Sequence, residues 1–293
     1  MPSISFDRVA HAYDATRGYP SSVDQQIAKS IVHMVNAKTE TTFLEVGVGT
    51  GRIAFPLASL GHTYTGVDIS EKMAKLLATK LLANDWEEYK QAWGSLSDEN
   101  GASVHTVWRF REAVKHAAVR LVLSDMTALP FSDASFDVVL AVHVFHLVDG
   151  WQQAIREVIR VLRPGGAFLH CWDEFVNTEA WPVGETWGNI VRELGCEVKR
   201  PGASARSEVT SWLKEQGLQP QEFPTVQWEI TQTPREAVEQ VTRRLWSSTW
   251  VVPDDIFATS VERLESWAKD YFSADMDTPF KGVRQFVICK IEV

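Results

Sequence analysis

The sequence is poor in cysteine and has no long apolar run. Only three cysteines occur in 293 residues, Cys171, Cys196 and Cys289, and none forms a CxxC pair. A scattered, odd-numbered set predicts reduced thiols and argues against a disulfide framework or a structural zinc site. No stretch approaches the roughly 18 apolar residues of a membrane span, and the N-terminus lacks the apolar centre of a signal peptide. We therefore expect a cytoplasmic protein without a membrane partner.

Clusters of positive charge are also missing. The chain has 29 lysines and arginines against 38 aspartates and glutamates, a formal net charge of −9. Proteins that bind the phosphate backbone of nucleic acids need clustered Lys and Arg side chains, so nucleic acid is not an expected partner. Hydrophobic residues make up 45% and charged residues 23% of the chain, which is typical of a folded protein and too apolar for intrinsic disorder.

Tryptophan is absent from the first 85 residues, although the chain contains 12. Most of the tryptophans lie in two segments, from Trp86 to Trp108 and from Trp172 to Trp267. Both segments interrupt the alternation of strand and helix patterns that organises the rest of the chain. They are therefore expected to be additions to a smaller core.

Alternating strands and helices are predicted from residue 42 onward. Thr42 to Gly51 reads TFLEVGVGTG, a short apolar run that ends in glycines, as expected of a buried parallel strand. A helix over 52–60 and a second strand over 63–68 follow. Further strands are expected over 119–124, 136–144, 167–172, 221–230 and 283–293. This order predicts an α/β fold with a doubly wound sheet.

The glycines of the first loop stand where a ligand would approach the backbone. Gly47, Gly49 and Gly51 alternate after the first predicted strand, and glycine permits both positive φ and close approach. Asp68 ends the second predicted strand, where a carboxylate can accept hydrogen bonds from both hydroxyls of a ribose. The fingerprint for nicotinamide dinucleotides needs a small residue at the position of Arg52, so a dehydrogenase is disfavoured.

With these motifs in this order, the chain resembles the class I S-adenosylmethionine (SAM) dependent methyltransferases, in particular the type 11 small-molecule group similar to quinone-biosynthesis enzymes. The resemblance covers about residues 40–173 and rests on FLEVGVGTG, GVDIS, SDMTALPFSDASFDVVLAVHVFHLV and LRPGG. It implies a Rossmann-like, doubly wound, mostly parallel seven-stranded sheet with helical cap insertions. The expected parts are an N-terminal helical cover at 1–40, a SAM-binding core at 41–173 with a helical insertion near 84–118, and cap helices with the last two strands at 174–293.

The resemblance also implies a site for SAM. Glu45 would face the methionine ammonium, Asp68 would bind the ribose hydroxyls, and Gly47, Gly49 and Gly51 would make room for the tail and the ribose. The other implied contacts are Ile69, Met73, Asp125 and Met126 at the adenine, His143 beside the methionyl part, and Tyr13 and Arg17 in the cover. SAM has no phosphate, so acids for an ammonium and a diol suit it better than a cluster of Lys and Arg. Aromatic faces attract its sulfonium cation.

Three side chains are candidates for a general base. His146 is the first, because the unperturbed pKa of histidine, about 6.5, lies close to physiological pH. Asp173 and Glu174 are the others. A histidine that only packs or forms hydrogen bonds is an equally weighted reading of His146. His143 and His146 form an H-x-x-H pair, but without the Glu of HExxH or a third ligand, so no metal is expected.

The acceptor pocket is expected just after the fifth predicted strand. Trp172, Trp181 and Trp187 are the candidates for its walls, because ligands bind at the carboxyl edge of open α/β sheets. The alternative for each of these tryptophans is ordinary packing in the cap.

The expected function is methyl transfer from SAM to a small-molecule nucleophile. The sequence leaves open the acceptor, its reacting atom (O, N or C) and the oligomeric state. The alternatives are a non-catalytic SAM-binding protein and a protein or RNA methyltransferase. The fourth predicted strand continues as AVHVFH, without the Asn/Asp-Pro-Pro-Tyr tetrapeptide of amino-group methylases that act on nucleic-acid bases or glutamine.

Overall fold

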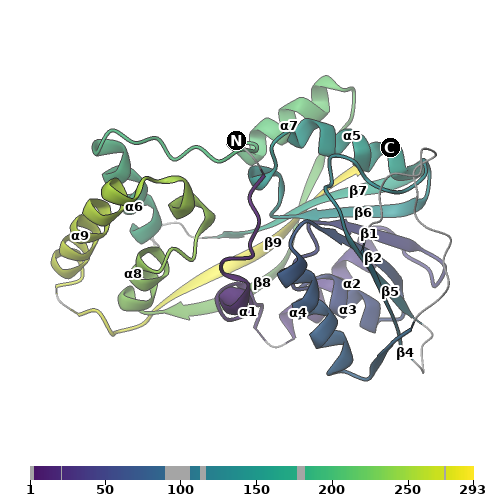
Figure 1. The fold of residues 1–293 in the computed structure, drawn as a ribbon, viewed down its shortest axis with the longest axis horizontal. Helices are drawn as coiled ribbons and strands as arrows, with labels where there is room; N and C mark the ends of the chain where they lie inside the picture. The colour runs from purple at the N-terminus through teal and green to yellow at the C-terminus, as the bar shows by residue number, and fades with distance from the viewer. Residues whose placement is uncertain (1–2, 21, 90–105, 113–116, 177–181, 274) are drawn as a thin grey trace.

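The computed structural model describes residues 3–20, 22–89, 106–112, 117–176, 182–273 and 275–293. In this part of the chain, one mixed sheet of nine strands forms the centre of the molecule (Figure 1). The strand order is β3-β4-β5-β2-β1-β6-β7-β9-β8. Helices cover both faces of the sheet, and a separate group of helices stands beyond one end (Figure 1).

Five central strands run parallel, as the apolar runs predicted. They are β1 (Thr42–Val46), β2 (Thr63–Asp68), β5 (Ala118–Leu123), β6 (Phe136–Val142) and β7 (Leu162–Phe175). Their side chains are buried on both faces, which is why the sequence shows continuous rather than alternating apolar residues. Because parallel strands share one carboxyl edge, the loops after β1, β2, β5, β6 and β7 meet on one side of the sheet.

Two long antiparallel strands complete the sheet beside β7. They are β9 (Phe280–Glu292), which pairs with β7, and β8 (Gln221–Gln232), which pairs with β9. Their ends extend past the core toward the outlying helices (Figure 1). The two strands thereby connect the core to the rest of the chain.

The expected helical insertion at 84–118 was wrong for the residues that the structure describes there. They form β3 (Trp86–Glu88) and β4 (Val107–Glu112), an antiparallel pair that extends the sheet from β5. The sheet consequently has nine strands in the described chain instead of the expected seven. Phe110 is fully buried between exposed or half-buried neighbours, and β4 covers an edge that β5 would otherwise leave unpaired.

The helices on the two faces of the core bury two separate apolar layers. On one face lie α2 (Val23–Met34), α3 (Ala54–Ser59) and α4 (Glu71–Leu82). On the other face lie α5 (Trp151–Val161) and α7 (Arg206–Glu215). Adjacent residues of β1 alternate between the layers: Phe43 packs with the first group and Leu44 with the second.

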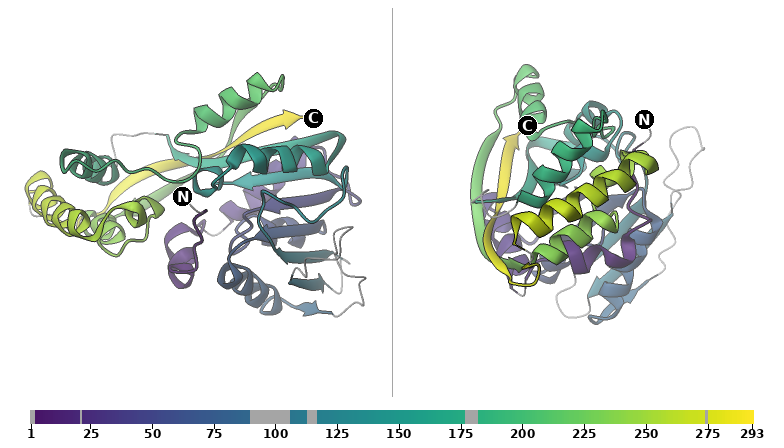
Figure 2. Two further views of the ribbon diagram at one scale, coloured as in Figure 1. Left: turned by 45° about the horizontal axis from the view of Figure 1, so that its top comes forward. Right: turned by 90° about the vertical axis from the view of Figure 1, so that its left-hand side faces the viewer.

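Three further helices form the cap. They are α6 (Pro182–Glu193), α8 (Pro234–Thr242) and α9 (Asp254–Tyr271), which share a small apolar core of their own. A short 3₁₀ helix, η3 (Ser247–Val251), connects α8 to α9. Figure 2 shows the three cap helices grouped together at one end of the molecule.

The N-terminal segment lies between the core and the cap (Figures 1 and 2). It contains α1 (Ala10–Arg17), and its extended start is bonded to the loop after β6 through the N–H of Ile4 and the carbonyl of Leu147, 2.9 Å apart. Among the described residues, no helix is both long and apolar enough to cross a membrane.

Candidate functional site

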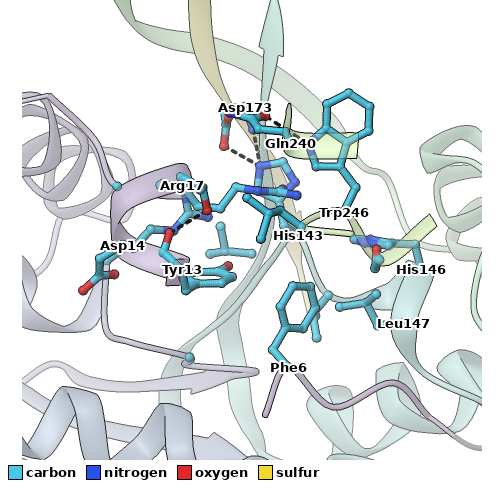
Figure 3. A pocket seen from close by; sticks show the side chains of 18 of the residues that line it. Phe6, Tyr13, Asp14, Arg17, His143, His146, Leu147, Asp173, Gln240 and Trp246 are labelled. Atoms are coloured by element: carbon cyan, nitrogen blue, oxygen red, sulfur yellow. Dashed lines mark hydrogen bonds and ion pairs between the residues drawn. The ribbon is translucent and has the colours of Figure 1, made fainter. Parts of the chain in front are cut away.

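One cavity of about 1160 Å³ opens at the carboxyl edge of the parallel strands. Its lining comes from the N-terminal segment, the loops after β1, β2, β5 and β6, the ends of β7, β8 and β9, and the helices of the cap. Figure 3 shows side chains from the N-terminal segment, the loop after β6, the end of β7 and the cap around a common space. The cavity therefore joins the region of the glycine motif to the region between core and cap.

The glycine loop fits close to the end of β6. Gly47 has a φ of +74°, and a Cβ atom there would lie 2.6 Å from Cγ2 of Val144. Gly49, with a φ of +56°, faces the cavity beside Met73, whose Cε would be 3.3 Å from an added Cβ. A side chain at Gly47 would collide with Val144 and one at Gly49 would press on Met73, so both glycines let the loop lie close to residues that line the cavity.

Gly51 has a different role from the one that the resemblance implied. It does not line the cavity, and a Cβ there would lie 2.4 Å from Cδ1 of Leu77 on α4. Its missing side chain lets α4 pack against the loop. Gly51 thus makes room for a helix, while Gly47 and Gly49 make room at the cavity.

Asp68 ties the glycine loop to the end of β2. Its Oδ2 accepts a hydrogen bond from the N–H of Gly49 and its Oδ1 accepts one from the N–H of Ser70, both at 2.8 Å. Burial raises the pKa of Asp68 to about 6, against the lowering effect of these bonds, so the carboxylate is mostly ionised at neutral pH. Asp68 lines the cavity, where it can accept further hydrogen bonds from hydroxyl groups.

Glu45 lies behind the loop and is 2% exposed. Its Oε2 accepts a hydrogen bond from the hydroxyl of Tyr64 at 2.9 Å. Burial raises the pKa of Glu45 to about 8, so the side chain is largely neutral at pH 7 in this structure. Glu45 is not part of the cavity wall, and a cation near it would favour its ionised form.

The residues that the resemblance assigned to adenine come together at the same cavity. Ile69 and Met73 follow β2, and Asp125 and Met126 follow β5. The Oδ1 of Asp125 accepts hydrogen bonds from the N–H and the hydroxyl of Thr127, at 2.8 and 2.9 Å, which fixes the turn. Apolar walls with one fixed carboxylate at the rim suit a flat heterocycle with an amino group.

The N-terminal cover is held to the core by polar contacts of α1. Asp14 accepts a hydrogen bond from the hydroxyl of Thr50 and forms an ion pair with Lys80, whose Nζ is 3.1 Å from Oδ2. Thr50 belongs to the glycine loop and Lys80 to α4. Tyr13 and Arg17, on the same helix as Asp14, both line the cavity.

Phe6 connects the N-terminal cover to the cap. Its ring makes edge contacts with Tyr13, at 5.5 Å between centroids, and with Trp250, at 4.8 Å. Arg8 lies over the ring of Trp250 at 5.4 Å. The segment consequently touches the core, the cavity and the cap.

His143 and Asp173 form a pair in the middle of the cavity (Figure 3). The Nε2 atom of His143 contacts the carboxylate of Asp173, and the backbone N–H of Asp173 donates to the same Nε2 at 2.8 Å. Oδ2 of Asp173 is also 2.6 Å from Nη2 of Arg284, and the hydroxyl of Tyr19 lies 3.5 Å from Oδ1. Burial alone would raise the pKa of Asp173, but His143, Arg284 and Arg52 outweigh it and hold that pKa below its usual range.

His146 also lines the cavity, on the 3₁₀ turn η1 (Phe145–Leu147). Burial lowers its pKa to about 2, and the nearby cation of Arg200 acts in the same direction. The imidazole is therefore neutral at physiological pH and is a poor proton acceptor compared with an ordinary histidine.

The structure corrects the expected walls of the acceptor pocket. Trp172 and Glu174 lie on the face of β7 opposite to Asp173 and Phe175, because side chains of a strand alternate. Glu174 accepts hydrogen bonds from Trp172, Gln285 and Arg206, at 3.1, 3.0 and 2.6 Å, away from the cavity. Its expected part as a general base has no support in this geometry.

Trp187 is a core residue of the cap. It is 2% exposed and its Nε1–H donates to the hydroxyl of Ser260 at 3.0 Å. It does not line the cavity, so the expectation of a substrate contact was wrong for Trp187 as it was for Trp172. Trp181, the third expected wall, falls outside the described residues.

Two tryptophans that the sequence analysis did not single out do line the cavity. Trp228 comes from β8, and Trp246 lies just after α8 with its Nε1–H donating to the amide oxygen of Gln240 at 3.1 Å. Arg284 on β9 was also missed. Strand alternation alone would have placed Trp172 and Asp173 on opposite faces, but no local pattern shows that β8, β9 and α8 return to the same cavity.

The chemistry of this cavity fits SAM. The backbone of the glycine loop lines the cavity at Gly47 and Gly49, ionised Asp68 accepts hydrogen bonds at the end of β2, and Tyr13 lines the cavity from the cover. Within the described residues, no group of three or more His, Cys, Asp or Glu side chains is arranged to hold a metal ion.

Comparison with known families gives the same result as the motifs. Residues 44–170 match the family described as "Methyltransferase domain". This segment is similar to a methyltransferase domain. It begins in β1 and ends in β7, so it contains the glycine loop, Asp68 and His143. The resemblance drawn from the four motifs is therefore confirmed.

Curated relatives extend over different parts of the chain. The mouse mitochondrial 2-methoxy-6-polyprenyl-1,4-benzoquinol methylase is 30% identical over 177 residues, which are 56% of this chain and 53% of the relative. The 27-O-demethylrifamycin SV methyltransferase of Amycolatopsis mediterranei is 28% identical over 225 residues, 76% of this chain and 65% of the relative. The chain thus spans about half the length of the first of these relatives and somewhat less than two thirds of the second.

Solved structures share the fold of the methyltransferase domain. A putative methyltransferase from Bacillus halodurans aligns with a TM-score of 0.54 and 16% identity, covering 90% of this chain and 97% of the other. At this identity the similarity shows the fold alone. It extends the Rossmann-like architecture beyond the segment that the family match covers.

Proposed function

We propose that the protein transfers a methyl group from SAM to a small-molecule nucleophile. The observation that carries the proposal is the continuity of one cavity from the glycine loop and Asp68 to the cap residues Gln240 and Trp246. A donor bound at the loop and an acceptor bound under the cap would share one space. The names of the quinol methylase and the rifamycin methyltransferase, both acting on small molecules, support this reading.

The donor would bind with its ribose at Asp68 and its adenine between Ile69, Met73 and Met126. The amino group of the adenine would donate to Asp125. The methionine end would extend past Gly47 and Gly49, toward the cover residues Tyr13 and Arg17. In this position Glu45 would compensate the charge of the ammonium group, and its proton would be released on binding.

The protein's contribution to the reaction would be positioning and exclusion of water. SAM is already activated, so the enzyme must chiefly hold the nucleophile in line with the methyl carbon. The cover and the cap both contribute to the cavity wall, which separates the reacting groups from bulk water. An acceptor that reacts through a hydroxyl or a protonated amine must also lose a proton.

A small acceptor is favoured over a protein or RNA chain. The N-terminal segment contacts the cap through the rings of Phe6 and Trp250, 4.8 Å apart, and Phe6 also lines the cavity, so both parts enclose the space for an acceptor. The acidic balance of the chain, −9, also disfavours RNA. A non-catalytic SAM-binding protein is the remaining alternative. It would bind SAM but would not transfer the methyl group.

The proposal is tested with SAM labelled in its methyl group. The purified full-length chain is incubated with labelled SAM and the fraction below about 1 kDa of an extract from cells of the source organism, and label is followed into products by chromatography and mass spectrometry. We expect label in a small molecule together with equimolar S-adenosylhomocysteine (SAH). SAH binding without any transfer of label would favour the non-catalytic alternative, and label found only in added protein or RNA would overturn the small-molecule assignment.

A further inference from the structure

His143 has a backbone conformation that its residue type rarely adopts. It follows β6 directly with a φ of +52°, the left-handed region, which costs a non-glycine residue free energy. Its N–H donates to the carbonyl of Cys171 on β7 at 3.1 Å, which holds the residue in place. The turn directs the imidazole into the cavity, where 31% of the side chain is exposed. Seven non-glycine residues of the described chain have a positive φ, and among them only His143 lines the cavity.

The carboxylate of Asp173 defines which ring nitrogen carries the proton. Asp173 is ionised and paired with Arg284 at 2.6 Å, so its oxygens can only accept hydrogen bonds. Its contact with Nε2 of His143 therefore favours a hydrogen on Nε2. The backbone N–H of Asp173, whose nitrogen is 2.8 Å from the same Nε2, would instead donate to a lone pair there. Because a hydrogen bond to an ionised carboxylate is about twice as strong as one between neutral groups, the carboxylate decides the tautomer. The lone pair of the neutral ring is then on Nδ1.

The Nδ1 atom of His143 is accessible. Within the described chain it has no hydrogen-bond partner, and it is not among the buried unpaired polar atoms, which include Nδ1 of His62 and of His170. A neutral imidazole with one nitrogen held by a carboxylate and the other open to a cavity is the arrangement of a general base.

We propose that His143 is the general base of the methyl transfer and that Asp173 positions it. The proposal rests on the proposed function and names the residue that removes the acceptor's proton, which implies an acceptor with an O–H or N–H group. As the acceptor atom bonds to the methyl carbon, its proton passes to Nδ1 of His143. The bond from the methyl carbon to sulfur breaks with its electron pair left on sulfur, so the neutral SAH is released. The imidazolium then gives the proton to water.

The charges around His143 suit this task. Asp173 on β7 stabilises the imidazolium that forms, and Tyr19 adds a hydroxyl to the same carboxylate. Arg284 on β9, Arg52 after the glycine loop and Arg17 on α1 are the cations nearby, and His146 and His170 are the neighbouring imidazoles. Burial and the cations lower the pKa of His143 below its ordinary value, so the ring is unprotonated at neutral pH.

His146 is the competing candidate and fits less well. Burial, with Arg200 beside it, lowers its pKa to about 2, so it binds a proton weakly. No carboxylate is bonded to its ring in the described structure. A general base must gain a proton during the reaction. The positive charge of a neighbouring arginine disfavours a protonated imidazole, and His146 has no carboxylate beside it to offset this effect.

The first test is NMR of the full-length protein with ¹⁵N-labelled histidine and saturating SAH, in the wild type and in Asp173→Asn and His143→Gln. We expect the His143 signals, assigned by their loss in His143→Gln, to show a proton on Nε2 and none on Nδ1 at pH 7. In Asp173→Asn the pKa of His143 should fall, because the anion that stabilises the imidazolium is gone. A proton on Nδ1 of the wild type, or an unchanged pKa in Asp173→Asn, would overturn the proposal.

The second test measures transfer of labelled methyl to the same low-mass fraction over pH 5 to 8. His143→Gln should be slower by about 100-fold or more, and Asp173→Asn should be slower with its acidic limb moved to lower pH. Both variants should still bind SAH. His33→Gln, an exposed histidine on α2, is the matched control and should match the wild type. Full activity of His143→Gln with loss in His146→Gln would overturn this inference while leaving the proposed function intact, whereas absence of transfer by the wild type would refute the proposed function itself.

Discussion

The guanidinium of Arg52 donates a hydrogen bond to the main-chain carbonyl oxygen of Arg17. This bond joins the end of the glycine loop to the end of α1, residues 35 positions apart in the chain. The same guanidinium lies over the rings of Tyr19 and Tyr13, at 4.8 and 5.7 Å from their centroids. The residue that argues against a nicotinamide fingerprint thus helps Asp14 to hold the N-terminal cover over the cavity.

We predict that Arg52→Met loosens the cover. Without the bond to Arg17 and the contacts with the two tyrosines, α1 should open more often, and bound SAH should leave faster. Hydrogen exchange measured by mass spectrometry should show faster exchange in residues 10–17, and stopped-flow dissociation should show a higher off-rate. Arg163→Met, which removes an arginine paired with Asp137 far from the cavity, should leave both quantities unchanged. Equal exchange at α1 in the wild type and Arg52→Met would refute this role of Arg52.

Glu45 predicts a specific dependence of stability on pH. Its folded-state pKa, about 8, is above the ordinary value of 4.5, so its contribution to stability is fully present below about pH 4.5 and is lost as the pH rises to about 8. Glu45→Gln cannot titrate. The free energy of unfolding of the wild type relative to this variant should therefore fall with rising pH in this window, by at most about 1.4 kcal/mol per pH unit.

Urea unfolding of both proteins at several pH values between 5.5 and 8.5 measures this difference. Glu88→Gln, at an exposed position of β3, serves as the control and should show no such trend. A difference between wild type and Glu45→Gln that stays constant from pH 5.5 to 8.5 would show that Glu45 is ionised in the free protein.

We predict that Trp187 stabilises the cap and does not contact the acceptor. Trp187→Ala removes a ring buried in the cap core and should lower the free energy of unfolding of the cap by about 3 to 5 kcal/mol. Ser260→Ala leaves the indole N–H without its acceptor and should cost about 1 to 3 kcal/mol. Thermal unfolding followed by calorimetry tests both values, with Trp246→Phe at the cavity wall as the comparison. A stable Trp187→Ala variant with altered specificity for the acceptor would reverse the assignment.

The sequence predicted the parallel core and its loops well, because these features depend on local patterns. The apolar run before Gly47, the acid at position 68 and the end of the helix at Val161 each reflect a constraint within a few residues. The expected turn before the fifth strand was wrong, because β7 already begins at Leu162. The cavity lining accordingly includes most of the expected cofactor residues, from Tyr13 to His143. Glu45 and Gly51 are the expected residues that lie behind it.

The additions to the core could not be predicted in the same way. Whether residues 107–112 form a strand depends on the free edge of β5, with which they pair. The local sequence of these residues does not show that this edge is free. Trp172 and Trp246 are chemically identical, and only the register of β7 and the return of α8 decide that the second faces the cavity. The concentration of tryptophan after position 85 correctly indicated the added parts, but not which rings pack and which meet a ligand.

The pair His143–Asp173 shows the same limit. Both residues were candidates from their positions at strand ends, but with separate roles. Their contact depends on β6 and β7 being adjacent and on the left-handed backbone at His143. The sequence pattern contains neither fact.

Isothermal titration calorimetry with SAM and SAH tests the central claim most directly. The wild type should bind both compounds with dissociation constants in the micromolar range or below. Asp68→Ala removes the acceptor that we propose for the ribose hydroxyls and should weaken binding by about 1.5 to 3 kcal/mol. Asp270→Ala, at an exposed position of α9, should bind like the wild type. If neither compound binds to the wild type, or if Asp68→Ala binds SAH as tightly as the wild type does, the assignment of this cavity to SAM is contradicted.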